Sequence, residues 1–312
     1  MADLAAGRPR ASVAATVGLL LFLVLTPPVF TLAPLAGLLL LSGPRSLQEW
    51  CWIGASLVWL AVSVAASQGV MEQTVMAGGT MAAGAFLVLV LRWSRPFLDR
   101  ALAALALAGV TLTFWGWWLG IGWQDIQSSV LRQGWEMARE LTQTTGGSGT
   151  AALAGAMPLA EAVAQGVGPM AAVFPSLMAL CALAGLAMAW SWYHRIAHQP
   201  LGSPLGQVAQ FRFSDQLVWG MVAGIGLLVV PAGEAGRIAG QNLVLFFGGL
   251  YVVRGLGIAR SWSRQVPGLL LGLMALSLLF ILPVALGGLL SLGLADTWLD
   301  FRRRLAPPPV EG

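Results

Sequence analysis

The sequence predicts an all-α protein: a polytopic bundle of eight to ten transmembrane helices with an amphipathic helical hairpin on its outer face. Three observations predict this class. Of the 312 residues, 57% are hydrophobic and 10% are charged, whereas a soluble protein of this size has about 25% charged residues. Apolar runs recur along the chain at lengths that cross a hydrocarbon layer of roughly 30 Å. The arginines, finally, collect on alternate connections between those runs.

The apolar runs between charged residues define ten candidate spans. Their approximate bounds are 12–26, 29–42, 51–68, 74–91, 101–120, 169–191, 216–231, 240–257, 267–281 and 283–295. The first two meet at Pro27 and Pro28, and the last two meet at Pro283. Because proline removes a helical hydrogen bond and bends the helix, one kinked span is the alternative for each pair.

The arginine distribution decides between these alternatives. All 17 basic residues are arginine, and ten crossings with a cytoplasmic N-terminus leave only Arg132, Arg139 and Arg237 on the outer side. Merging only the final pair of spans would move the run 302–304 outside, which the positive-inside rule disfavours. We therefore expect ten crossings, or eight with two re-entrant hairpins, in a bacterial inner (plasma) membrane. Both termini are then cytoplasmic.

The segment 121–168 is the one sizeable stretch expected outside the membrane. Ile126, Val130, Met137 and Leu141 recur at helical spacing, which predicts an amphipathic helix. The sequence "TTGGSGT" then predicts a turn, and a second helix is interrupted or started at Pro158. We expect an extracytoplasmic helical hairpin that serves either as a cap over the bundle or as a lid over a binding cavity.

The chain has fourteen tryptophans, and most of them lie where the spans are expected to end. Most of them, including Trp118 in "FWGWW", fit an aromatic belt at the membrane interface. Trp59 and Trp219 are placed deeper, where either residue could line a cavity.

Several classes of chemistry are excluded by the residues that the sequence lacks. Without lysine, no P-loop can be completed and no Schiff base can form. There is no GxSxG or HExxH motif and no pair of carboxylates within a span. His194 and His198 could share a helix face, but Asp215 is the sole further candidate ligand, so we expect no metal site. We expect no enzyme, no cofactor and no nucleic-acid partner.

Asn242, preceded by Gln241, is the best polar candidate inside a span. Its amide either bonds a neighbouring helix or contacts a substrate or lipid headgroup. The middles of the spans carry no Asp, Glu or Arg, which argues against a proton-coupled pump.

The second half of the chain resembles the YybS-like family of predicted bacterial membrane proteins, domain of unknown function 2232. The resemblance rests on "FRFSDQLVWGMV", "NLVLFFGGLYVVRGLGIA" and "GLADTWLDFRRR", and is best over residues 169–305. The matching residues are Trp219, Asn242, Tyr251, Gly255, Gly293, Asp296, Trp298 and Arg302. The resemblance implies a fold rather than an activity. By looser analogy it groups the chain with substrate-binding S-components of vitamin transporters and with shape-determining membrane scaffolds.

We expect the protein to be a non-enzymatic subunit that binds a small apolar or amphipathic solute for transport. It has no nucleotide site of its own, so we expect another protein to supply the energy. Its tentative solute contacts are Asn242, Gln241, Trp219, Tyr251 and Trp118. Membrane lipid and other membrane proteins are the remaining expected partners. The alternative is a scaffold that organises other membrane or envelope proteins. A binding subunit predicts a cavity of several hundred Å³, whereas a scaffold predicts a filled core.

The last motif, Gly293, Asp296, Trp298 and Arg302, is interpreted as structural. Tryptophan and arginine anchor the end of a span, but anchoring does not explain Asp296. We predict that Asp296 pairs with Arg254 or Arg260 and thereby ties the last span to the eighth.

Overall fold

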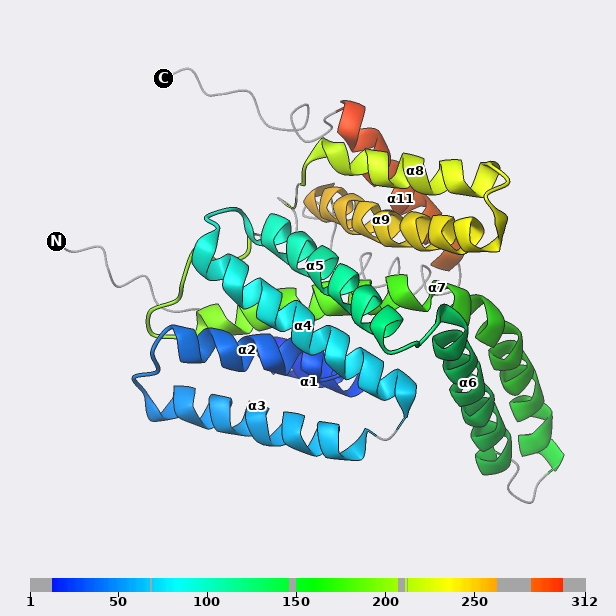
Figure 1. Cartoon of the computed structure of the whole chain (residues 1–312), viewed down its shortest axis with the longest axis horizontal. Coiled ribbons are helices and arrows are strands. Elements are labelled where there is room, and N and C mark those ends of the chain that lie inside the picture. Colours follow the sequence, from blue (N-terminus) through cyan, green and yellow to red (C-terminus); the bar gives the residue numbers. More distant parts are fainter. Residues whose placement is uncertain are drawn as a thin grey trace. The chain divides into compact units, whose positions relative to one another are not determined.

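The structure is a computed structural model that describes residues 13–67, 69–145, 150–206, 211, 213–262 and 282–299. Every element within these residues is a helix, so the predicted all-α class is confirmed (Figure 1). The chain divides into two compact units, Met1–Leu205 and Gly206–Gly312, and each is described by itself.

The first unit holds seven described helices: α1 (Val13–Leu25), α2 (Val29–Leu41), α3 (Leu47–Ala66), α4 (Val70–Arg92), α5 (Phe97–Trp118), α6 (Trp123–Thr145) and α7 (Thr150–Ile196). The core lies around α2, which packs against α3, α4 and α7. Its residues Leu35, Leu38 and Leu39 are completely buried. Two glycines permit this packing, because a Cβ on Gly185 of α7 would collide with Phe30 of α2 and a Cβ on Gly79 of α4 would collide with Val29.

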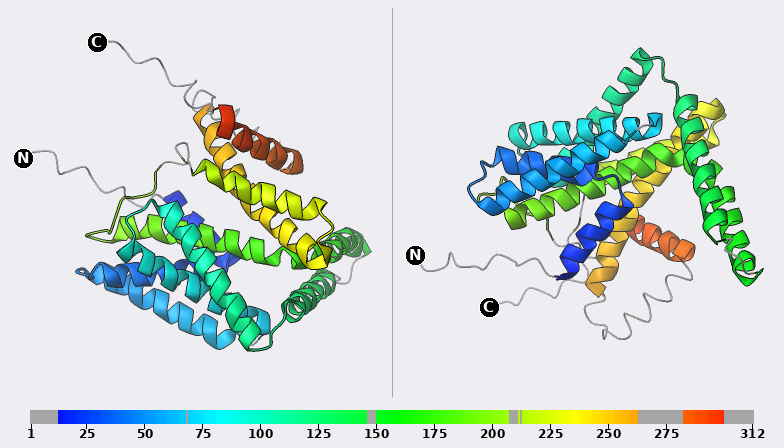
Figure 2. Two further views of the ribbon diagram at one scale, coloured as in Figure 1. Left: turned by 45° about the horizontal axis from the view of Figure 1, so that its top comes forward. Right: turned by 90° about the horizontal axis from the view of Figure 1, so that it is seen from below.

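The amphipathic segment forms a hairpin, as Figure 2 shows, but its second arm differs from the prediction. Helix α6 packs along the first part of α7, where Gly134 lies against Val167. Helix α7 starts at Thr150 rather than at Pro158 and continues without a break through the predicted span 169–191. The physical reason is that the sequence before the predicted span 169–191 is rich in alanine, which favours helix. The second arm of the hairpin and the span therefore form one continuous helix.

The second unit holds a 3-10 turn, η2 (Asp215–Leu217), and the helices α8 (Val218–Val229), α9 (Gly233–Trp262) and α11 (Leu282–Leu299). Helix α9 packs against both α8 and α11. Helices α8 and α9 can approach closely because Gly224 and Gly240 lie at their contact. A Cβ on either glycine would collide with the facing helix.

Within the part of the chain that the structure describes, six helical segments are long and apolar enough to cross a membrane: α3, α4, α5, residues 165–196 of α7, residues 233–260 of α9, and α11. Helix α2 and the segment Asp215–Val229 are shorter apolar helices. Thr26–Pro28 separates α1 from α2, so the first predicted pair consists of two helices. The predicted span 267–281 lies outside the described residues, so ten crossings stay a prediction.

Candidate functional site

An apolar pocket of about 350 Å³ lies inside the first unit. It is lined mainly by α4, α5 and α7, with Phe30 of α2 at one end and Trp123 and Ile126 of α6 at the other. Helices α4 and α5 pack against each other and are connected by residues 93–96 only, so they run antiparallel along the pocket. The hairpin therefore contributes the wall at one end of the pocket.

Small residues keep this space open. The lining includes Gly78, Gly79, Gly109 and Gly116, together with the alanines 82, 108, 179 and 182. An added Cβ on Gly79 would collide with Val29 and Phe30, so that glycine serves helix packing. A Cβ on Gly109 would meet no atom within 4 Å, so packing does not account for that glycine.

None of the residues that line the pocket is ionisable. Its two threonines are already bonded to their own helices: Thr74 Oγ1 donates to Val70 O at 2.7 Å and Thr113 Oγ1 donates to Gly109 O at 2.8 Å. Trp123 differs from them, because its indole Nε1 is buried and has no hydrogen-bond partner among the described residues. The pocket is therefore an uncharged and largely apolar space.

The residues predicted to contact a solute do not line this pocket. Trp118 lies at the C-terminal end of α5 and is 74% exposed. The other four belong to the second unit. Tyr251 is completely buried, and Gln241 is partly buried with an Oε1 that lacks a partner among the described residues. The Asn242 amide donates to Ile238 O of its own helix at 2.9 Å.

Trp219 does line a space, a groove of about 540 Å³ within the second unit. The groove runs between α8 and α11, and Asp215, Leu294 and Trp298 also border it. Both tryptophans are exposed.

The predicted pairing of Asp296 is confirmed for Arg254. Arg254 Nε donates to Asp296 Oδ2 at 3.0 Å, and both side chains are buried. Arg254 Nη1 also donates to Asp215 Oδ1 at 3.0 Å, and the guanidinium lies over the ring of Phe213 at 5.2 Å. One arginine of α9 thus joins α11 to the turn before α8.

The two glycines of the resemblance lie at the same crossing. A Cβ on Gly255 would collide with the Leu289 carbonyl of α11, and a Cβ on Gly293 would collide with the Tyr251 carbonyl of α9. The two backbones touch here, which brings Arg254 within reach of Asp296. Arg302, the last residue of the motif, lies outside the described residues.

The two histidines have separate partners. The ring of His194 contacts the carbonyl oxygens of Trp190 and Gly202, at 2.9 and 3.3 Å. Helix α7 ends at Ile196, so His198 lies beyond it and bonds Glu49 instead. Asp215, considered above as a third metal ligand, contacts Arg254. Among the described residues, no three His, Cys, Asp or Glu side chains are grouped to hold a metal ion.

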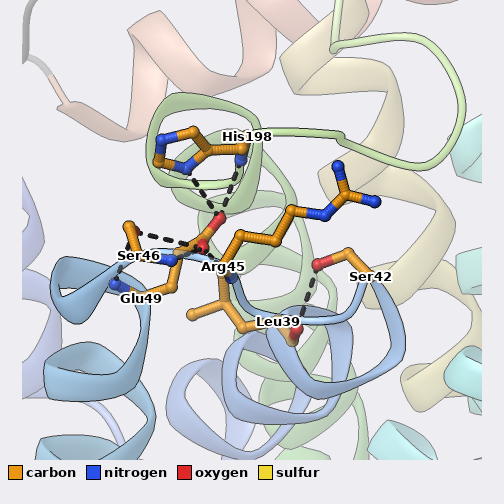
Figure 3. A network of polar contacts seen from close by, with 6 residues as sticks. All are labelled: Leu39, Ser42, Arg45, Ser46, Glu49 and His198. Carbon is orange, nitrogen blue, oxygen red and sulfur yellow. Dashed lines mark hydrogen bonds and ion pairs between the residues drawn. The ribbon is translucent and has the colours of Figure 1, made fainter.

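Glu49 lies in a network of polar contacts at the start of α3, as Figure 3 shows. Its Oε2 accepts hydrogen bonds from the backbone N–H groups of Arg45 and Ser46, at 2.7 and 2.9 Å. Its Oε1 accepts from the His198 N–H at 2.8 Å, with His198 Nδ1 3.1 Å away. The buried carboxylate therefore connects the beginning of α3 to the chain after α7.

The sequence analysis overlooked Glu49, although a local signal was present. "SLQE", Ser46 to Glu49, is a capping box, in which the serine and the glutamate bond each other's backbone N–H. The contact with His198 had no such signal, because 149 residues separate the two.

A protein-family model described as "Predicted membrane protein (DUF2232)" matches residues 14–297. No curated protein shows a significant match to the chain, and no solved structure does.

Proposed function

The chain belongs to this DUF2232 family of predicted membrane proteins, and from that premise we propose that it is a non-enzymatic binding subunit for a small apolar or amphipathic solute. It is a multi-pass membrane protein. In this proposal it resides in the bacterial inner membrane with both termini in the cytoplasm. The solute enters the pocket of the first unit.

The observation that carries the proposal is the pocket between α4, α5, α6 and α7. Its volume of about 350 Å³ falls within the range of roughly 300–1,000 Å³ that is usual for small-molecule sites. A core that served only stability would be packed to a density that leaves few voids larger than a water molecule. A cleft of this size in an integral membrane protein supports binding as its role.

The position of the hairpin supports the same function. Trp123 and Ile126 belong to the first turn of α6 and line the pocket. The chain enters α6 through Gly120, which has a φ of +71°, a conformation that glycine adopts without strain. A movement of the hairpin at this turn would change access to the pocket, which favours the lid over a simple cap.

Transport needs a partner in this proposal. Without lysine the chain has no P-loop, so another membrane protein supplies the energy. In the scaffold alternative, the chain organises other membrane proteins, and the pocket has no function.

The test is to purify the protein in mild detergent and identify bound small molecules by mass spectrometry. Gly109→Phe is the informative variant, because Gly109 lines the pocket and no neighbouring atom has to move to admit a Cβ. Gly84→Phe is the matched control, since Gly84 also has open space around it but lies outside the pocket lining.

We expect a molecule that co-purifies with the wild type and with Gly84→Phe, and that is lost or reduced at least about tenfold in Gly109→Phe. A tenfold loss corresponds to about 1.4 kcal/mol of binding free energy. Equal amounts in all three proteins would contradict the proposal. Recovery of protein partners alone, with no small molecule, would favour the scaffold.

A further inference from the structure

Arg100, in the first turn of α5, is a buried cation for which the first unit supplies no anion. The residue is 6% exposed. Its guanidinium forms no hydrogen bond and no ion pair with any residue that the structure describes, the neighbouring Asp99 included. Arg254, which is also buried, bonds two carboxylates. Because buried arginines are nearly always paired and buried donors nearly always have acceptors, Arg100 indicates a missing anion.

The guanidinium keeps its outer edge available to such an anion. Nε is completely covered, so it cannot meet a ligand. Nη1 and Nη2 also lack hydrogen bonds to described residues, but they are not covered in this way. The Trp190 ring lies against the guanidinium, with 4.9 Å between Cζ and the ring centre. A ring in that position stabilises the cation through its face and leaves the Nη edge, which binds oxyanions through two parallel N–H groups.

The chain that follows α7 lies beside this edge without bonding it. An added Cβ on Gly202 would lie 3.8 Å from Arg100 Nη2. The Gly202 carbonyl faces His194 Nε2 at 3.3 Å, and the Ser203 carbonyl accepts from Trp190 Nε1 at 3.1 Å. These two carbonyl oxygens therefore already have partners on α7, and neither of them serves Arg100.

The position of Arg100 along the chain indicates which oxyanion it meets. The segment Phe97–Trp118 is long and apolar enough to cross a membrane, so Arg100 lies near one end of a span. Arg92 and Arg95, just before this segment, are both exposed. Clustered arginines beside a span attract the phosphate groups of anionic lipids at the membrane surface. Phosphate is thus the oxyanion that this position favours.

We propose that Nη1 and Nη2 of Arg100 bind a phosphate group at the start of α5. The site is separate from the apolar pocket, because neither Arg100 nor Trp190 lines that pocket. The inference therefore goes beyond the proposed solute binding and does not depend on it. Its chemistry is shared by the headgroup of an anionic phospholipid and by a soluble phosphate.

The test measures binding to the full chain, delipidated in a neutral detergent, by isothermal titration calorimetry with protein-free micelles as the blank. The probes are dioctanoyl phosphatidylglycerol, dioctanoylglycerol, which has the same chains without phosphate, and inorganic phosphate. Arg100→Gln removes the charge. Arg95→Gln is the matched control, because Arg95 is exposed and also lies over a tryptophan ring, that of Trp93, at 5.9 Å.

We expect at least one phosphate-bearing probe to bind the wild type and Arg95→Gln equally, and to bind Arg100→Gln at least about tenfold more weakly, as the loss of a charged hydrogen bond predicts. Dioctanoylglycerol should not distinguish Arg100→Gln from the wild type. The proposal is overturned if no phosphate-bearing probe binds, if each binds Arg100→Gln as tightly as the wild type, or if Arg95→Gln loses as much affinity as Arg100→Gln.

Thermal unfolding separates this site from a purely structural role of Arg100. A buried charge without a partner is costly, so Arg100→Gln should melt no lower than the wild type when phosphate is absent. The phosphate-bearing probe that binds should then raise the melting temperature of the wild type but not that of Arg100→Gln. If Arg100→Gln melts lower without the probe and the probe stabilises both proteins equally, Arg100 serves only its packing against Trp190, and the proposal fails.

Competition between the two phosphate-bearing probes identifies the source of the phosphate. If inorganic phosphate binds through Arg100 and displaces phosphatidylglycerol, the site accepts a soluble phosphate. If phosphatidylglycerol binds through Arg100 and inorganic phosphate does not displace it, the occupant is the headgroup of a membrane lipid.

Discussion

Arg254 joins three elements of the second unit. Its guanidinium is completely buried and bonds carboxylates from two other elements, Asp296 of α11 and Asp215 of η2. A charge inside a membrane segment is expensive unless it is paired, so arginines there occupy structural or functional positions. Here the two partners come from α11 and η2, and the arrangement supports a structural role.

Arg254→Met should destabilise the protein by about 3–5 kcal/mol, because Asp296 would keep a buried charge without its guanidinium. The double variant Arg254→Met, Asp296→Leu should recover most of the loss, since it removes both charges. Thermal unfolding in detergent micelles measures both effects.

The control for this experiment is the exposed pair of Arg237 and Glu234 on the same helix. Arg237→Met should leave the melting temperature unchanged, since exposed ion pairs contribute little. A double variant no more stable than Arg254→Met would show that Arg254 acts through contacts other than Asp296.

At the scale of elements, the α9–α11 crossing explains why the ion pair can form. The backbones meet at Gly255 and Gly293, where any side chain would collide with a carbonyl of the facing helix. Small residues allow this approach in membrane proteins, where packing rather than the hydrophobic effect drives association between helices. The close approach of the backbones at the two glycines thus allows the neighbouring ion pair between Arg254 and Asp296 to form.

Gly293→Ala should separate α9 from α11 and cost about 1–3 kcal/mol, the usual effect of overpacking. Gly288→Ala on the same helix is the matched control, because its Cβ would meet no atom within 4 Å. The control should be neutral or slightly stabilising, as alanine favours helix over glycine. Equal melting temperatures for the two variants would mean that the close contact at Gly293 is not required.

At the scale of the whole molecule, the orientation in the membrane remains a prediction from the arginines. It places the α6–α7 hairpin outside the cell and the connection between α4 and α5, residues 93–96, inside. Two single cysteines test it in a background where Cys51 and Cys181 are replaced by serine: Trp135→Cys in α6 and Ser94→Cys, both at exposed positions.

A membrane-impermeant maleimide added to intact cells should label the cysteine at position 135 and spare the one at position 94. Position 94 should react only after lysis, which controls for its accessibility. Labelling of position 94 alone in intact cells would invert the topology, and with it the side from which a solute reaches the pocket.

The all-α membrane class, the hairpin and the pairing of Asp296 with an arginine could all be predicted from the sequence. These follow from local physics: apolar runs of membrane length, helical periodicity, and a charge that has to be paired. Glu49 carried a local signal as well, in its capping box, but its bond to His198 required the fold.

The position of the pocket in the first unit depends on how distant helices pack together. The predicted contacts Asn242, Gln241, Trp219 and Tyr251 were selected as polar or aromatic residues within spans, whereas the lining of the pocket in the first unit is mostly apolar and includes four glycines and four alanines. Small residues occur throughout the chain, and nothing local distinguishes Gly79, which a neighbouring helix presses against, from Gly109, beside which space remains. A cavity is a property of how helices meet, so it appears only when their packing is known.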